Sequence, residues 1–308
     1  MIDVQRLRVL RAVAEHGSFN RAATELRLTP SAVSQHIAAL ERSLGTEVVS
    51  RSTRGVALTP AGRIMVAAAE SVTAELTHAR QQIDRLETGR TQLTVATFSS
   101  GGRLLLPGAL ARLAAEHPGT VVHVREAEPE DSLPLVRQGA VDLALAYEFD
   151  GPLPGWSGPR DRLTWSPLLE DPLHVVLPRR HPLAGRAELD LGELAAEPWV
   201  LGCLKTAGFL RRHAEQAGFD PDVRSTTTDY FFARSLVAAG LGISLIPSIA
   251  LTPKVPGVRT VPLRPPAPTR HLGVATLRGR RHAQARTLIE ALREQADAVA
   301  NKPVPYGK

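Results

Sequence analysis

The chain has 308 residues, of which 43% are hydrophobic and 22% are charged, a composition that is typical of a soluble globular protein and excludes a disordered one. Its single cysteine, Cys203, excludes an intrachain disulfide and a cysteine-based zinc site and fits a reducing cytoplasm. The N-terminus lacks the apolar core of a signal peptide, and the apolar segment 236–251 is interrupted by glycine and proline and is too short to span a membrane. We therefore expect a cytoplasmic protein without a membrane partner.

The formal net charge of +6 is unevenly distributed along the chain. Residues 1–58 contain eight arginines and five acidic residues, whereas residues 59–90 contain four of each. The remaining excess of positive charge is spread thinly over the rest of the chain. A basic segment at one end favours a polyanionic partner.

Three short helices are predicted in the first 45 residues. The first ends at Gly17, which suits the left-handed conformation of a C-cap, and the second, 20–26, starts after the N-cap Ser18. The third, 30–44, follows the N-cap Thr29 and has proline at its first position, where the missing N–H costs nothing. Two short helices joined by a tight turn, the second one amphipathic, are typical of a helix-turn-helix.

The segment after the third helix, TEVVSRSTRGVALT (46–59), predicts two short strands around a basic hairpin tip, so the motif is a winged variant. The third helix has Val33, Ile37 and Leu40 on one apolar stripe and small or uncharged polar residues opposite. Ser and Gln can pair with base edges, whereas acidic side chains would repel phosphates. Small residues are also compatible with packing against a neighbouring helix, but the arginine-tipped wing favours DNA. The predicted DNA contacts are Ser31, Ser34, Gln35, Ala38, Arg51 and Arg54.

The segment from Thr59 to about Glu87 is helical without interruption. Its apolar residues are spaced alternately by four and three positions, a heptad seam held for three repeats. One alternative is that this helix packs only on its own domain. We favour a second copy of the chain as the partner, which predicts a homodimer. The predicted seam is Met65, Ala69, Val72, Leu76, Ala79, Ile83 and Leu86.

The rest of the chain alternates strands and helices, including a strand over 92–97 and a helix over 102–117. This alternation predicts parallel sheets with helices on both faces. Proline-rich stretches at 153–167 and 262–268 indicate that the chain crosses twice between two lobes. The predicted domains are a DNA-binding domain (1–58), a linker helix (59–88), an effector domain (89–300, with lobe I at about 89–163 and 269–300 and lobe II at about 164–268) and a flexible tail (301–308).

The segments SFNRAATELRLTPSAVSQHIAALERSLG (18–45) and RSTRGVALTPAG (51–62) resemble the N-terminal signature of LysR-type transcriptional regulators. LLPGALARLAAEHPG, VRQGAVDLALA and LVAAGLGISLIP resemble pieces of the family's effector domain, so the resemblance covers nearly the whole chain. It implies an α + α/β fold: a winged helix-turn-helix, a long linker helix and a two-lobed α/β effector domain that resembles a periplasmic binding protein.

The same resemblance implies a bacterial regulator that binds double-stranded DNA as a homodimer or homotetramer and associates with the nucleoid when bound. It also implies a small-molecule co-inducer between the lobes, with RNA polymerase as a further partner. The family's base-contacting positions fall on Pro30, Ser31, Ser34 and Gln35, and its wing arginine falls on Arg54. The sequence departs from the family pattern at Pro30 and His36, where Gln is common, which bears on operator preference. It also departs at 48–49, where Val-Val replaces Leu-Phe, which bears on packing under the wing.

A second site is predicted where strand 92–97 runs into Ser99 and Ser100 at a helix start. Hydroxyls and free N–H groups there suit an anion, and the resemblance implies that this turn holds the carboxylate of an inducer. Plain N-capping without a ligand is the alternative. Thr228 and Asp229 repeat the arrangement in the other lobe, where the acid disfavours an anion. The candidate effector contacts are Ser99, Ser100, Arg103, Tyr147, Cys203 and Thr228, the last four with a structural role as the alternative.

We expect no enzyme activity, cofactor or metal site. The sequence lacks the G-x-S-x-G, P-loop and H-E-x-x-H motifs, and GLGISL (240–245) runs from helix to strand, the wrong order for a dinucleotide fingerprint. A transport role would need a signal peptide, and a purely architectural DNA-binding role would not need an effector domain. For Cys203 as a redox sensor, an intermolecular disulfide or a sulfenic acid are the remaining chemistries.

Overall fold

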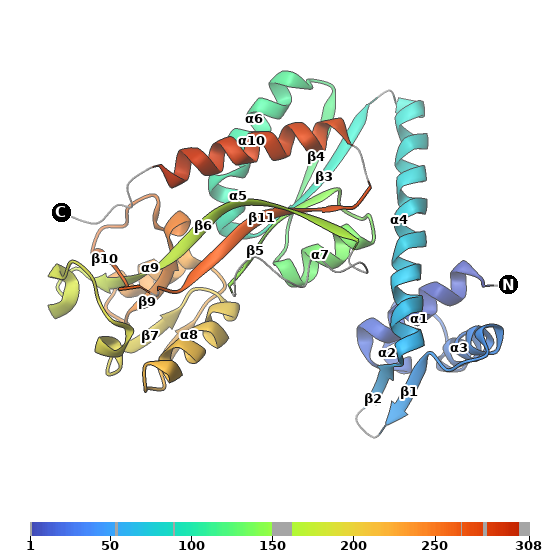
Figure 1. Ribbon diagram of the computed structural model, residues 1–308, viewed down its shortest axis with the longest axis horizontal. Helices are drawn as coiled ribbons and strands as arrows, with labels where there is room; N and C mark the ends of the chain where they lie inside the picture. The colour runs from blue at the N-terminus through green and yellow to red at the C-terminus, as the bar shows by residue number, and fades with distance from the viewer. Residues whose placement is uncertain are drawn as a thin grey trace. The chain divides into compact units, whose positions relative to one another are not determined.

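The computed structural model describes residues 2–52, 55–88, 90–149, 162–265, 267–279 and 282–301 (Figure 1). The chain divides into two compact units, one formed by Met1–Arg90 with Arg137–Ala140 and the other by Thr91–Val136 with Val141–Lys308. Each unit has its own hydrophobic core. Most of the predicted flexible tail, from position 302 onward, lies outside the described residues.

The first unit is a winged helix-turn-helix followed by a long helix. Its elements are α1 (Val4–His16), α2 (Phe19–Leu26), α3 (Pro30–Leu44), β1 (Val49–Ser52), β2 (Gly55–Leu58) and α4 (Pro60–Thr88). The predicted caps are confirmed: Gly17 and Gly45 are left-handed at φ 58° and 70°, and Thr29 Oγ1 accepts from Ala32 N at 3.2 Å. The predicted hairpin is also confirmed, because β1 and β2 pair antiparallel.

Close contacts fix the wing to its neighbours. Glu41 Oε1, on α3, accepts hydrogen bonds from Val48 N at 2.9 Å and Val49 N at 3.4 Å, where the wing begins. In α4, a Cβ added to Gly62 would lie 1.9 Å from the carbonyl oxygen of Val48. Only glycine therefore lets α4 start this close to the wing.

The second unit contains the remaining elements. They are β3 (Thr91–Thr97), α5 (Ser99–Leu104), α6 (Leu106–Glu116), β4 (Thr120–Glu126), α7 (Pro129–Arg137), β5 (Leu143–Glu148), β6 (Leu163–Pro178), η2 (Pro182–Gly185), η3 (Leu191–Leu194), β7 (Pro198–Leu201), α8 (Leu204–Gln216), β8 (Asp222–Thr226), α9 (Tyr230–Ala238), β9 (Ser244–Pro247), η4 (Ser248–Leu251), β10 (Val258–Pro262), β11 (Thr269–Leu277) and α10 (Ala283–Ala300). The predicted helix 102–117 is two helices, because Pro107 in the first turn of α6 cannot continue α5.

The main sheet has the strand order β10-β6-β11-β5-β3-β4, with β9 also paired to β6. The prediction of parallel sheets is only partly right. β3 pairs parallel with β4 and β5, and β7 pairs parallel with β8, but β11 pairs antiparallel with both β5 and β6. The reason is topological: β6 carries the chain from one lobe to the other and β11 carries it back.

The crossover to the second lobe lies inside one continuous strand. The first part of β6, from Leu163 to Pro172, pairs with β11, and the part from Leu173 onward pairs with β9 and β10. The proline-rich stretch predicted as the crossing, 153–167, ends within the first part of β6, and its residues 153–161 lie outside the described residues.

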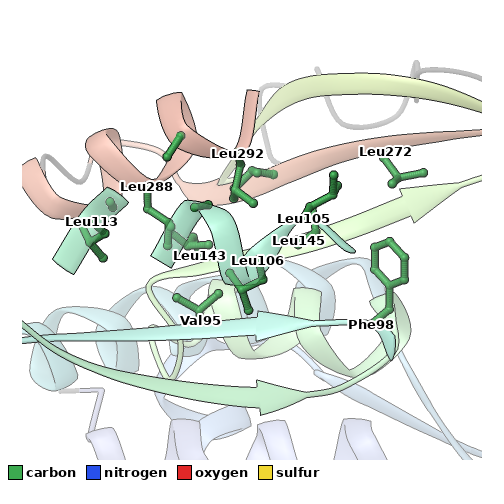
Figure 2. Packing of buried hydrophobic residues seen from close by; sticks show 14 of the residues in the cluster. Val95, Phe98, Leu105, Leu106, Leu113, Leu143, Leu145, Leu272, Leu288 and Leu292 are labelled. Carbon is green, nitrogen blue, oxygen red and sulfur yellow. The ribbon is translucent and has the colours of Figure 1, made fainter. Parts of the chain in front are cut away.

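Each lobe of the second unit has an apolar core. In the first lobe, α6 and α10 place leucines against the sheet, as Figure 2 shows for Leu106 on α6 and Leu292 on α10 beside Leu145 on β5. In the second lobe, Trp199 and Leu245 belong to a separate cluster. No helix within the described part of the chain is both long and apolar enough to cross a membrane.

Candidate functional site

A small pocket of the second unit brings together most of the residues predicted to contact an effector. Ser99, Ser100, Tyr147, Cys203 and Thr228 all line it. The pocket holds about 10 Å³ of free volume, which is about enough for one water molecule. These residues therefore lie together, as the sequence predicts. The pocket that they line is much smaller than an ordinary metabolite site.

Arg270, on β11, is the most unusual group in this pocket. Its side chain is 0% exposed, and its Nε donates to Asp171 Oδ2 at 2.8 Å, an acid that is also 0% exposed. Nη2 donates to Ser100 Oγ at 3.0 Å. Among the described residues, Nη1 has no hydrogen-bond partner. A buried donor without an acceptor is costly unless a ligand or water supplies one.

Aromatic rings surround the same guanidinium. Its Cζ lies 4.9 Å from the ring centroid of Tyr147, 5.2 Å from that of Phe98 and 5.6 Å from that of Tyr230. Burial lowers the pKa of Arg270, but Asp171 and the two tyrosines more than offset this, so that the pKa is raised overall. Arg270 is therefore a fixed cation inside the protein.

The Tyr147 hydroxyl connects two other pocket residues. It donates to Glu128 Oε2 at 2.7 Å and lies 3.4 Å from Cys203 Sγ. Burial is the main cause that raises the pKa of Tyr147, so the phenol keeps its proton. Cys203 is 8% exposed and is the N-cap residue of α8, a position where the helix dipole favours negative charge.

Of the two helix starts at the pocket, the start of α5 is the one predicted to hold an anion, and α5 has only six residues, so its dipole is weak. The start of α9 is the one where Asp229 is expected to disfavour an anion. At the start of α9, the Asp229 carboxylate already accepts from Phe231 N at 2.7 Å. Arg103 does not line the pocket; its Cζ stacks 3.9 Å over the Phe231 ring, so that it links α5 to α9.

Four important pocket residues were not predicted: Glu128, Tyr230, Phe231 and Arg270. The sequence offers a weak signal for Arg270, because an arginine lies at the start of a strand, TRHLGVATL, whose later residues are mostly apolar. Glu128 follows the end of a strand, as Ser99 does, and the same reasoning would have found it. No group of His, Cys, Asp or Glu is placed to hold a metal within the described parts of the chain.

A larger open hollow of about 530 Å³ lies beside the start of α10. Its lining includes both acids and bases, among them Asp142, Arg286 and Glu290. None of the predicted site residues lies there. By volume alone, this hollow would be chosen as the ligand site. Its lining residues mix acidic and basic groups, however, and do not direct hydrogen-bond donors toward one point as the Arg270 guanidinium does.

The predicted DNA-binding face of α3 is accessible. Val33, Ile37 and Leu40 are buried, as expected for the inner stripe. On the other side, the residues with exposed side chains are Pro30, Ser31 and Gln35, and Ser34 and Ala38 are partly exposed. The Arg51 side chain and all of Arg54 lie outside the described residues.

The residues of the predicted seam of α4 fall into two groups that differ in burial. Ala69 is 2% exposed and packs, with Met65 and Val72, on the core of its own unit. These three residues therefore pack within their own unit, with Met65 and Val72 partly exposed, and their place in a dimer seam stays a prediction. In the other half, Leu76, Ile83 and Leu86 are 56%, 50% and 86% exposed, and Ala79 is exposed as well.

Comparisons with known proteins agree with this architecture. Residues 4–63 match the family described as bacterial regulatory helix-turn-helix protein, lysR family, and residues 87–297 match the LysR substrate binding domain. Full-length BenM has the same fold, with a TM-score of 0.60, 22% identity and 99% of both chains covered. A Corynebacterium glutamicum OxyR mutant with H2O2 bound superposes with a TM-score of 0.58 at 25% identity, covering 97% of this chain and 94% of that one.

Curated relatives extend over most of the chain. The DNA-binding transcriptional dual regulator OxyR of Escherichia coli is 28% identical over 312 residues, covering 98% of both chains. A probable hydrogen peroxide-inducible genes activator of Mycobacterium avium is 34% identical over 257 residues, covering 80% of this chain and 78% of the relative. A winged helix-turn-helix, a two-lobed α/β unit and these matches make the chain a member of the LysR family, whose transcriptional regulators are not enzymes, bind DNA and respond to effector molecules in the substrate-binding domain.

Proposed function

We propose that the chain binds its operator as a dimer through α3, and that a ligand in the pocket of Arg270 controls this binding. The observation that carries the proposal is the fully buried guanidinium of Arg270, a lining residue of that pocket, whose Nη1 has no hydrogen-bond partner within the described parts of the chain. A ligand oxygen there would complete its hydrogen bonding. We extend the proposal to a homotetramer, to contact with RNA polymerase and to a cytoplasmic, nucleoid-associated location, which the family resemblance implies.

For DNA, we propose that the exposed side of α3 enters the major groove. Its outward residues are short and uncharged, which lets the helix approach base edges, and the inner stripe is fixed by the core. The wing arginines would contact the backbone or minor groove. The proposed contacts are Pro30, Ser31, Ser34, Gln35, Ala38, Arg51 and Arg54.

Replacing Gln35 by alanine tests the base-reading role. Gln35 is exposed on the leading half of α3, and loss of one base pairing should reduce the preference for operator over random DNA by roughly 1–3 kcal/mol. The measurement is competition binding at fixed salt concentration. Ser43→Ala, an exposed change at the far end of the same helix, is the control. An unchanged operator preference in Gln35→Ala would remove Gln35 from the recognition surface.

For the effector, two ligand classes have support. A carboxylate, the class first expected, would use the Ser99 and Ser100 hydroxyls and Arg270 Nη1. It would require the pocket to widen, because about 10 Å³ does not accommodate a metabolite. A hydroperoxide needs much less space, and relatives in Escherichia coli and Mycobacterium avium carry the name hydrogen peroxide-inducible genes activator. We favour the hydroperoxide.

The proposed reaction occurs at Cys203, the only cysteine of the chain. Its sulfur would attack one peroxide oxygen, so that an S–O bond forms and the O–O bond breaks. The thiol is oxidised to a sulfenic acid, and the other oxygen leaves as water after taking the thiol proton. Arg270 Nη1 would hold the peroxide beside the sulfur of Cys203, which lies 3.4 Å from the Tyr147 hydroxyl.

Adding hydrogen peroxide to the purified protein separates the two classes. We expect the single free thiol to disappear, the protein mass to rise by one oxygen atom and operator affinity to change. Cys203→Ser should bind operator and lose this response. If the thiol survives, while a panel of carboxylates raises the melting temperature of both proteins equally, the effector is a carboxylate and the hydroperoxide assignment is wrong.

A further inference from the structure

We propose that Glu128 makes this pocket select small uncharged ligands and reject anions. The inference rests on the proposed function only in taking the pocket as a ligand site. Glu128 sets the selectivity of the pocket, and the ligand is a neutral molecule with an oxygen that can accept a hydrogen bond from Arg270 Nη1.

The charge of Arg270 is already balanced. Its Nε lies 2.8 Å from Asp171 Oδ2, and both side chains are 0% exposed. In a desolvated site a cation that has its own carboxylate partner attracts a second anion only weakly, because the pair is nearly neutral from outside. What Arg270 still offers is the Nη1 hydrogen bond, which a neutral oxygen accepts as well as an anionic one.

Two acids line the pocket beyond this pair. Asp229 is used by the first turn of α9, where it accepts from Phe231 N. Glu128 directly precedes α7, and its backbone carbonyl accepts from Ser132 N at 2.8 Å. Its side chain accepts a hydrogen bond from the Tyr147 hydroxyl, which lies 2.7 Å from Oε2, at the wall that also carries Cys203. A ligand anion would therefore enter beside a fixed carboxylate, in a cavity too small for a screening water layer.

The cations around the pocket do not reverse this balance. Arg103 is exposed and lies over the outer ring Phe231, so solvent screens its charge. Arg234 donates to the backbone carbonyls of Ala250 and Pro253. Neither residue lines the pocket. Among the described lining residues, the charged groups are Arg270, Glu128 and Asp229, which leaves the carboxylates in excess.

Replacing Glu128 by glutamine removes the charge and keeps an acceptor for the Tyr147 hydroxyl. We expect this variant to bind formate or chloride about ten- to a hundredfold more tightly than the wild type. The measurement is titration calorimetry with each sodium salt at constant ionic strength. Asp131→Asn is the control, because Asp131 is an exposed acid in the first turn of α7 outside the pocket and its loss changes the net charge equally.

A second measurement uses two oxidants that differ in charge. Hydrogen peroxide is neutral and peroxymonosulfate is an anionic hydroperoxide, and both would oxidise Cys203 by the same O–O cleavage. Glu128→Gln should raise the rate ratio of peroxymonosulfate to hydrogen peroxide about tenfold or more, and Asp131→Asn should leave it unchanged. A merely structural role of Glu128 would alter both rates together.

The outcomes separate this inference from the proposed function. If neither small anion binds Glu128→Gln more tightly than the wild type and the control variant, the selectivity role is wrong. If the anions do bind more tightly but no oxidant attacks Cys203, the hydroperoxide assignment fails while the role of Glu128 stands. Circular dichroism and operator binding of each variant confirm that it is folded.

Discussion

Replacing Leu76 by aspartate is expected to turn the protein into a monomer and to weaken operator binding by about a hundredfold or more. Leu76 is 56% exposed and lies in the half of α4 that does not pack on the core of its unit. An aspartate in an apolar helix–helix seam would lose its water without gaining a partner. A regulator that holds two recognition helices on one operator loses the second attachment when the dimer separates.

The position of Leu76 makes this test clean. Because Leu76 is not part of the core of the first unit, its replacement leaves that core intact and the variant should fold. Ala69→Asp, in contrast, would bury a charge in that core. Gln82→Asp is the matched control, since it adds the same charge to an exposed residue of α4 outside the seam. Light scattering gives the mass and footprinting gives the protected length. A Leu76→Asp protein that stays dimeric, or a monomer that protects both half-sites, would contradict the dimer proposal.

The parts of the fold that could be predicted are those whose causes lie within a few residues. Thr29 caps the backbone of α3 three residues later, and Gly45 ends the same helix by its own left-handed conformation. The wing follows from two short strands around a glycine. The break between α5 and α6 also has a local cause, because Pro107 cannot donate a backbone hydrogen bond and so does not continue the preceding helix.

The candidate site also contains some residues that local sequence patterns predict and others that they do not. Ser99, Ser100 and Thr228 were identified because strand ends and helix starts meet at one edge of an α/β unit. The Arg270–Asp171 pair could not be found from spacing, since the partners are 99 positions apart. Their contact depends on β6 and β11 running antiparallel, which the alternating pattern of strands and helices did not reveal. The local hydroxyls of Ser99 and Ser100 predict an anion, whereas the charge of Glu128 enters the pocket from another element.

Replacing Arg270 by methionine should lower the free energy of unfolding of the second unit by about 3–5 kcal/mol, because it leaves the Asp171 carboxylate buried without its cation. All three tryptophans, at 156, 165 and 199, belong to that unit. Tryptophan fluorescence in a urea titration of the full chain therefore reports its unfolding without a signal from the first unit. Asp171→Asn should also lower the free energy of unfolding, since it leaves the Arg270 guanidinium buried without its carboxylate partner. The double variant should recover about 2 kcal/mol or more relative to the sum of the single changes.

The pH dependence of the Arg270→Met variant shows whether the lost ion pair is the cause. Burial, its largest influence, already raises the pKa of Asp171, and Arg270 counteracts this rise. Without the arginine the folded-state pKa rises further above the unfolded value. A group with a raised folded pKa contributes its stability below the unfolded pKa and loses it as the pH rises through the folded one. The decrease in the free energy of unfolding of Arg270→Met, relative to the wild type, should therefore be largest near neutral pH. It should shrink as the pH falls toward about 4, the ordinary pKa range of an aspartate. A deficit that is independent of pH would assign the loss to packing against Phe98, Tyr147 and Tyr230 instead of to the stranded carboxylate.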